Sequence, residues 1–219
     1  MIDLSLFSRA RLDAALEALL ATQDSALHAY TPAPGLPALR SVLSEKLSDA
    51  GYPVAPEGIY ITCGAQAGRS ILARALLDPG DEVLFLTPPA EGILPAVRAA
   101  GAAVTELLTD RTRLLVLSGA SVPDGAAETL RVAEGRACLL ADCVTPGSEA
   151  AALALTTDAC VLNGDFGPAL SGECIGFLAV GSRFPAADRL TAAIAGAGRA
   201  MGYVNPPSLM QRAVLALLT

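Results

Sequence analysis

The sequence predicts an α/β protein, a three-layer α/β/α sandwich built around a mostly parallel sheet. From residue 59 onward, short apolar segments alternate with stretches of helical periodicity. Those short segments are apolar at successive positions, which is typical of strands covered by helices on both faces. Hydrophobic residues make up 53% of the 219 residues and charged residues 17%, so the chain can bury a sizeable core. We therefore expect one domain over residues 1–219.

The first fifty residues predict two amphipathic helices joined by a turn. Leucines recur at helical spacing between Leu12 and Leu20, and again from Leu36 to Leu47. Proline and glycine in the intervening Thr31–Gly35 stretch favour a turn. Residues 1–50 are thus expected to form an N-terminal helical segment of the domain.

The central part of the chain, residues 59–180, is expected to form the sheet. Seven segments have the length and apolar content of buried strands. They are Ile59–Thr62, Glu82–Leu86, Val104–Leu107, Arg113–Leu117, Cys138–Ala141, Ala159–Leu162 and Ile175–Val180.

Helical spacing of apolar residues predicts connections between the strands and a helical C-terminal segment over residues 185–219. The predicted helices are Gln66–Leu77, Gly92–Ala100, Ala127–Ala133, Pro185–Gly198 and Pro207–Leu218. In open α/β sheets, ligands bind beyond the carboxyl ends of the strands, so the functional residues are expected there.

Composition argues against several classes of protein. The net charge is −7 and the basic residues are scattered, which argues against a nucleic-acid surface. No apolar run reaches the roughly 20 residues that cross a bilayer, so we expect a cytoplasmic protein with no membrane segment. The five cysteines form no CxxC pair and His28 is the one histidine, so we expect no metal site and mostly buried, reduced thiols.

The basic residues are distributed unequally between the two types. Lys46 is the one lysine, and every other basic residue is an arginine. Any reaction that needs a lysine amine from this chain therefore depends on Lys46.

Eight short motifs follow one another along nearly the whole chain. They are His28–Arg40, Ile59–Gln66, Leu77–Val83, Thr87–Gly92, Arg111–Gly125, Leu140–Asp142, Gly172–Phe177 and Gly202–Ser208. In this order they resemble the motifs of the class I/II aminotransferases, although each is weak alone. The resemblance implies the fold of the large domain of fold type I enzymes, which use pyridoxal 5′-phosphate (PLP). It also implies a homodimer with its active sites at the interface, and we expect this chain to lack the family's C-terminal small domain.

The resemblance assigns roles to five residues. Asp142 stands where the family's acid pairs with the pyridinium nitrogen, although an aspartate here could also cap a turn. Gly64, Ala65 and Gln66 stand where the family binds phosphate, although glycine at a helix start could also serve close packing. Tyr30 matches the tyrosine that reaches the partner's cofactor, and the alternative is a half-buried tyrosine packed under the proline-rich turn. We expect these five to be vestigial.

Other family residues are missing. The segment expected to contain the Schiff-base lysine, Asn163–Ser171, has none, and Cys174 replaces the phosphate-binding arginine. The stacking aromatic, the asparagine and the second tyrosine are replaced near Ala90, at Ser121 or Val122, and at Thr145. From these losses we expect no catalytic residue and no covalently bound cofactor, with weak non-covalent binding of PLP or phosphate through Asp142 and the Gly64 turn left open.

The leading hypothesis is a degenerate, non-catalytic aminotransferase-like protein. It would act as a scaffold or interaction subunit, as a homodimer or paired with an intact aminotransferase-like chain. The alternative is an enzyme that performs PLP-independent chemistry on a small molecule in the same cleft. Its candidate residues are acids and thiols that could converge in that cleft, namely Glu91, Cys143, Asp165, Glu173 and Cys174. A thiol nucleophile would need a base, and His28 is the one histidine.

Overall fold

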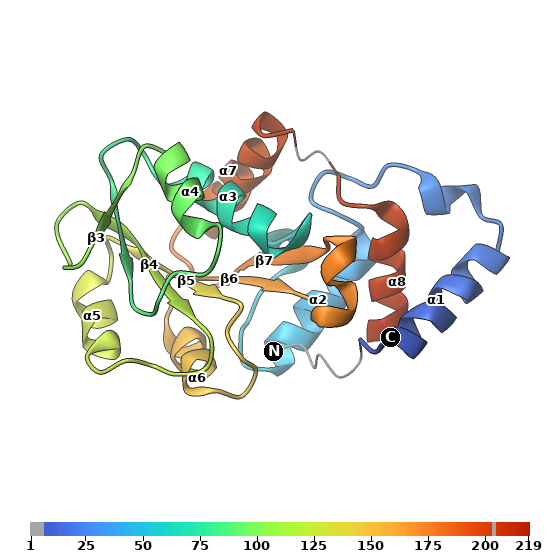
Figure 1. The fold of residues 1–219 in the computed structure, drawn as a ribbon, viewed down its shortest axis with the longest axis horizontal. Helices are drawn as coiled ribbons and strands as arrows, with labels where there is room; N and C mark the ends of the chain where they lie inside the picture. Colours follow the sequence, from blue (N-terminus) through green and yellow to red (C-terminus); the bar gives the residue numbers. More distant parts are fainter. Residues whose placement is uncertain (1–6, 203–204) are drawn as a thin grey trace.

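A seven-stranded sheet forms the centre of the protein (Figure 1). The computed structural model describes residues 7–202 and 205–219, so the first six residues and part of the Gly202–Ser208 motif lie outside the described residues. Every predicted strand is present, with ends shifted by up to three residues. The strands are β1 (Ile59–Thr62), β2 (Glu82–Phe85), β3 (Ala103–Thr105), β4 (Thr112–Ser118), β5 (Cys138–Asp142), β6 (Cys160–Asp165) and β7 (Gly176–Val180).

The strand order is β1-β7-β6-β5-β4-β2-β3. Neighbouring strands from β6 to β3 run parallel, whereas β7 is antiparallel to both β6 and β1. The prediction of a mostly parallel sheet is therefore confirmed. Because β4, β5 and β6 are adjacent and parallel, their carboxyl ends meet at one edge, where Asp142 pairs in register with Ser118 and Asn163.

Helices cover both faces of the sheet. The α-helices are α1 (Arg9–Ala21), α2 (Pro37–Asp49), α3 (Gly64–Leu76), α4 (Ile93–Ala99), α5 (Ala126–Ala133), α6 (Glu149–Thr156), α7 (Ala187–Ala200) and α8 (Ser208–Leu218). Short 3-10 turns are η2 (Ser25–His28), η3 (Pro56–Gly58) and η4 (Pro168–Glu173). The sequence reading missed α6, whose run of alanine and leucine shows no clear apolar and polar face.

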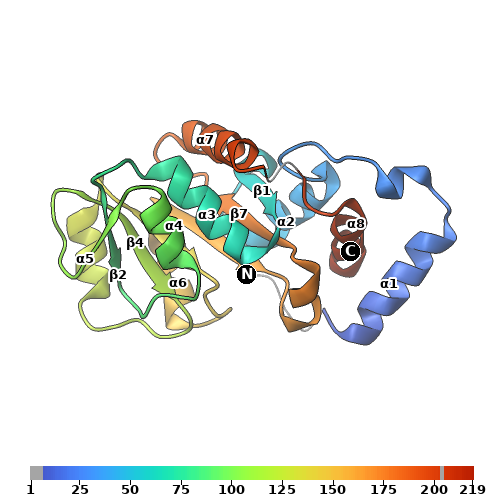
Figure 2. The ribbon, with the colours of Figure 1, turned by 45° about the horizontal axis from the view of Figure 1, so that its top comes forward.

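One apolar core lies on each face of the sheet, between the strands and the helices that cover them. On one face, α3, α4 and α7 pack on side chains such as Val83, Leu140 and Val161. On the other, α2, α6 and α8 pack on the alternate side chains of the same strands. Figure 2 shows α3, α4 and α7 together over one face of the sheet. No helix in the described part of the chain is both long and apolar enough to span a bilayer.

The end of the chain is tied to the N-terminal turn by a buried glutamine. Gln211 of α8 has no exposed surface, and its Oε1 accepts a hydrogen bond of 2.7 Å from the Leu36 backbone. Its Nε2 donates to Thr31 Oγ1 at 3.1 Å and to the Pro206 carbonyl at 3.0 Å. Gly35 lies against Ile61 so closely that a Cβ there would be 2.3 Å from the Ile61 side chain. The turn is therefore clamped between β1 and α8.

Replacing this glutamine should weaken the whole fold. Gln211→Leu keeps a side chain of similar size but removes its hydrogen bonds, which leaves buried backbone groups without partners. We expect this substitution to lower the free energy of unfolding by about 2–3 kcal/mol. The exposed Ala216→Gln on the same helix is the matched control, with an expected change within about 0.5 kcal/mol. Urea unfolding followed by circular dichroism measures both. Equal effects of the two substitutions would show that the Gln211 contacts are unimportant.

Candidate functional site

The candidate site lies at the carboxyl ends of β5 and β6, beside the N-terminus of α3. Asp142 is the last residue of β5 and has no exposed surface. Asn163 of β6 lies next to it, 3% exposed, and donates from Nδ2 to Asp142 Oδ1 at 2.8 Å and to the Ala65 carbonyl at 3.1 Å. The predicted acid is therefore located where parallel α/β sheets bind ligands.

An arginine of α3 already pairs with this acid. Arg69 Nε lies 3.0 Å from Asp142 Oδ1 and 2.9 Å from Oδ2, forming an ion pair. The Arg69 side chain is 12% exposed and that of Asp142 is fully buried. The pair is thus largely shielded from solvent and mobile ions, so the charge of Asp142 is balanced inside the chain.

Gln66, one of the predicted phosphate-binding residues, holds this arginine. Arg69 Nη1 donates to Gln66 Oε1 at 3.2 Å and to the Glu91 carbonyl at 3.4 Å. Gln66 Nε2 in turn donates to the Gly92 carbonyl at 3.1 Å. Gly92 has a φ of 84°, and a Cβ there would be 2.1 Å from the Gln66 amide, so glycine is required at this close contact.

The other predicted phosphate residues begin the same helix. Gly64, with a φ of 80°, and Ala65, which is buried, form the first turn of α3, and no side chain caps that helix end. No side-chain bond occupies the start of α3 at Gly64 and Ala65, whereas Gln66 is engaged by Arg69 and Gly92.

The acids and thiols of the alternative hypothesis do not form one cluster. Cys143 and Asp165 come together at the ends of β5 and β6, and Arg69 Nη2 lies 3.8 Å from Cys143 Sγ. Glu91 contributes its backbone carbonyl to Arg69, and its side chain is exposed. Cys174 lies instead beside Gly64, with Glu173 exposed next to it.

The chemistry of Cys143 does not favour a nucleophile at neutral pH. Desolvation of its thiol, followed by the carboxylates of Asp142 and Asp165, raises the pKa of Cys143 to about 12, and Arg69 offsets this only partly. The thiol therefore stays protonated, and the thiolate is the reactive form. His28, the candidate base, ends η2, which packs against α8.

The expectation of buried thiols holds for part of the set. Cys138 and Cys160 are buried, whereas Cys143 and Cys174 are exposed as residues and adopt left-handed backbone conformations with φ near 49° and 48°. The prediction was wrong for these last two because they follow or precede strands rather than lying inside them. Cys63, Cys138, Cys143 and Cys160 form no disulfide within the described part of the chain.

Burial of the Cys138 thiol should make the free energy of unfolding fall at alkaline pH. Burial raises the pKa of Cys138 from its ordinary 9.0 to about 12, so the folded protein favours the neutral thiol. This contribution is complete below about pH 9 and is lost as pH rises toward 12, by roughly 1.4 kcal/mol per pH unit. We expect Cys138→Ala to reduce the slope of unfolding free energy between pH 9 and 11, as measured by urea unfolding. An unchanged slope would contradict this origin of the alkaline sensitivity.

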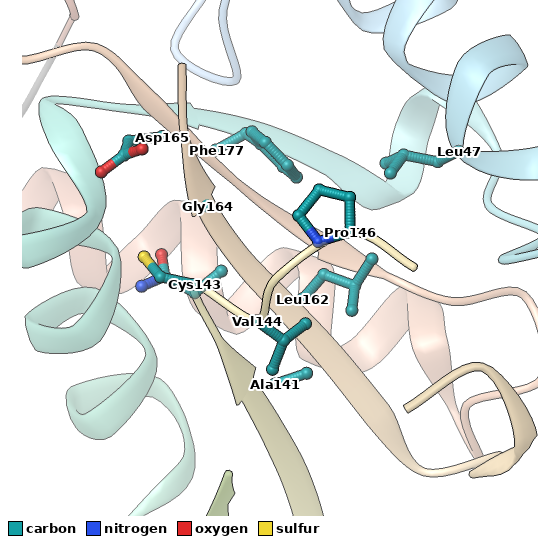
Figure 3. A pocket seen from close by; sticks show the side chains of 10 residues that line it. Leu47, Ala141, Cys143, Val144, Pro146, Leu162, Gly164, Asp165 and Phe177 are labelled. Atoms are coloured by element: carbon teal, nitrogen blue, oxygen red, sulfur yellow. The ribbon is translucent and has the colours of Figure 1, made fainter. Parts of the chain in front are cut away.

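An apolar cavity of about 80 Å³ opens on the opposite side of the same strand ends. Figure 3 shows Cys143 and Asp165 at one end and Leu47 of α2 at the other, with Pro146 between them. The cavity wall also includes Phe177, and most of its surface is apolar. Its size suits no more than a few heavy atoms, and it does not contain Asp142.

The segment expected to contain the Schiff-base lysine, Asn163–Ser171, instead places an aromatic side chain in the apolar core. Phe166 has no exposed surface, and its ring lies 5.3 Å from that of Phe7 and 5.7 Å from that of Phe177. Lys46 lies on α2, partly exposed, beside Leu47 of the apolar cavity wall.

Tyr30 is 92% exposed and follows η2. The alternative of a half-buried tyrosine under the proline-rich turn is therefore wrong. Tyr30 instead presents nearly its whole side chain to the surroundings, and Leu20, at 50% exposure, is a second exposed apolar residue of the N-terminal segment.

Arg69 is the site residue that the sequence reading missed. A signal was present, because Arg69 lies four residues after Ala65 and three before Leu72, both on the buried face of α3. A charged side chain on a face that packs against a sheet requires a partner. Asp142, at the end of β5, was already a candidate acid, and β5 lies next to β6, which α3 contacts.

Comparison with known proteins gives consistent matches. The family model for aminotransferase class I and II matches residues 4–129. An aspartate/prephenate aminotransferase of Thermus thermophilus is 34% identical over an aligned length of 129 residues, and the match covers 50% of this chain and 34% of that protein. An aspartate aminotransferase of Geobacillus stearothermophilus is 30% identical over an aligned length of 150 residues, with 58% of this chain and 37% of that protein covered. The chain thus spans about a third of the length of these relatives.

A solved structure gives the same result over more of the chain. The crystal structure of an amino transferase from Eubacterium rectale superposes with a TM-score of 0.85 at 26% identity. It covers 94% of this chain, and the chain covers 62% of it. The fold of the large domain of fold type I enzymes is therefore confirmed.

These matches correct the expectation that the chain takes no cofactor. Aminotransferases of this family depend on PLP, so excluding covalent PLP from missing motif residues was wrong. A side chain elsewhere in the fold can take over the role of a replaced motif residue, so the replacements alone do not exclude the cofactor. Asp142 is a suitable partner for a pyridinium nitrogen, but with Arg69 on its carboxylate and no exposed surface it does not fit the ring in the present arrangement. The chain belongs to the class I and II aminotransferase family.

Proposed function

We propose that this chain does not catalyse transamination by itself and acts as a non-catalytic subunit that pairs with a second chain. The observation that carries the proposal is Phe166, a fully buried ring in the segment where the resemblance implies the lysine. Transamination by PLP enzymes needs a lysine amine beside the ring to move protons. The proposal concerns this amine and does not depend on whether the chain binds the family's cofactor.

The ring contacts of Phe166 support this reading. A side chain held between Phe7 and Phe177 is part of the apolar core and cannot turn toward Asp142 without opening a cavity. Lys46 belongs to α2, whose buried residues face the opposite layer from α3. Arg69 cannot replace the lysine, because its side chain carries no primary amine and is bonded to both carboxylate oxygens of Asp142.

The exposed aromatic of the N-terminal segment supports pairing. Tyrosine is enriched among the anchor residues of protein interfaces, and Tyr30 is 92% exposed. The simplest partner is a second copy of this chain, and an intact aminotransferase-like chain is the other. We also propose that residues 1–219 act as one structural unit, with the N-terminal helices contributing the interface.

Catalysis is tested with purified protein, PLP and an amino-acid donor. We expect no 2-oxo acid product above that of PLP alone. Borohydride reduction followed by peptide mass spectrometry identifies any amine that carries a pyridoxyl group, with Lys46 as the one lysine side chain of the sequence. Turnover that disappears in Lys46→Arg would contradict the proposal.

Pairing is tested by light scattering after size exclusion over a range of concentrations. We expect a dimer whose dissociation constant rises at least about tenfold in Tyr30→Ser, because an exposed aromatic anchor contributes 2 kcal/mol or more at an interface. Leu107→Ser is the matched control, since Leu107 is 74% exposed after β3 at the far edge of the sheet. A monomer at all concentrations, or equal effects of both variants, would contradict pairing through Tyr30.

A further inference from the structure

We propose that Arg69 is an internal competitor for Asp142, so that the ion pair and a cationic ring nitrogen are alternative partners of the same carboxylate. The candidate ligand is a pyridinium bearing a phosphate, the chemical class to which the family's cofactor belongs. Arg69 then sets the affinity of the site for such a ring. The inference is independent of whether the chain transaminates.

Burial of the acid carries the first step. Asp142 has no exposed surface, so no ligand atom touches its carboxylate until a covering group moves. The polar groups that cover it are Asn163 and Arg69. Asn163 is 3% exposed and is also tied to the Ala65 carbonyl within α3, so moving it disrupts the sheet–helix contact. Arg69 reaches solvent with 12% of its side chain and is therefore the group that can leave.

Charge carries the second step. Arg69 supplies one positive charge to the one negative charge of Asp142 in a site shielded from solvent. A pyridinium that entered while Arg69 stayed would add an unbalanced buried cation, which is strongly unfavourable. Exchange of one cation for the other keeps the site neutral, so the two occupants exclude each other.

The remaining contacts of Arg69 show that it is held in place. Its two Nη groups reach Gln66, the Glu91 carbonyl and Cys143 Sγ, which belong to three different segments. A ring must therefore displace a guanidinium bonded to the acid and to these three groups. Release of Arg69 also frees Gln66, which lies in the first turn of α3.

The test measures binding of pyridoxamine 5′-phosphate to the full chain by titration calorimetry. This probe has the ring and the phosphate but no aldehyde, so a missing lysine does not affect it. We expect Arg69→Gln, which keeps a hydrogen-bond donor without the charge, to bind about tenfold more tightly than the unchanged protein or better, equivalent to about 1.4 kcal/mol. Arg74→Gln, an exposed arginine on the same helix, should bind like the unchanged protein.

Asp142 determines whether the gain arises by the proposed route. In the double variant Arg69→Gln with Asp142→Asn the gain should disappear, because no carboxylate remains for the ring nitrogen. Thermal unfolding checks that each variant is folded. Arg69→Gln leaves the charge of Asp142 without its partner, whereas the double variant lacks both charges and avoids this cause of unfolding. Equal or weaker binding by Arg69→Gln, a gain that persists without Asp142, or no binding by any variant would overturn the inference.

Discussion

Arg69→Ala is expected to lower the free energy of unfolding by about 3–5 kcal/mol, because it leaves the carboxylate of Asp142 buried without a counter-charge. Asp142 has no exposed surface, and among the described residues only Asn163 would remain to donate to it. Buried pairs are screened little by mobile ions, so the loss should persist at high salt. Urea unfolding at low and high ionic strength measures both features.

Arg74→Ala provides the control for this substitution. Arg74 lies on the same helix but is exposed, so its removal should change stability by no more than about 0.5 kcal/mol. If Arg69→Ala lost less than about 1 kcal/mol, the ion pair with Asp142 would contribute no more than an ordinary surface pair.

Phe166→Ala is expected to cost a similar amount, about 3–5 kcal/mol, through a different mechanism. Removing the ring leaves a cavity between Phe7 and Phe177, and these rings belong to the N-terminal segment and to β7. The ring of Phe166 connects separate parts of one core. The loss of stability should therefore appear as a lower unfolding midpoint with an unchanged denaturant slope.

Phe166→Leu is the matched comparison for that cavity. It keeps most of the apolar volume and should cost about half as much or less. A small loss in Phe166→Ala would mean that the ring is not part of the core, and the segment would then be free to carry a side chain toward the cleft. That outcome would remove the main support for a non-catalytic role.

Most of the sheet could be predicted from residue patterns. Fully buried strands such as β5 are uninterrupted apolar runs, and the turn at Asp78–Asp81 marks a helix–strand boundary clearly. The antiparallel β7 was not distinguishable, because buried strands look alike whichever way they run. Helix α6 was missed since its buried residues are alanines, which give little contrast between faces.

The site was predictable by position but not by contact. Local patterns place Asp142 at a strand end and Gly64 and Gln66 at a helix start, and the family resemblance implied their roles. The pairing of Arg69 with Asp142 joins residues far apart in sequence, and it depends on how α3 lies across β6 and β7. The exposure of Tyr30 likewise depends on where the N-terminal segment lies against α8.

A double-mutant cycle on Arg69 and Asp142 tests the central claim most directly, that the acid of this aminotransferase-family site is neutralised by an arginine of its own chain. The free energies of unfolding of the unchanged protein, Arg69→Leu, Asp142→Asn and the double variant give the coupling between the two side chains. We expect a coupling of about 2 kcal/mol or more, with the double variant more stable than Arg69→Leu. Additive effects within about 0.5 kcal/mol would contradict the account, because they would mean that the two side chains do not depend on each other.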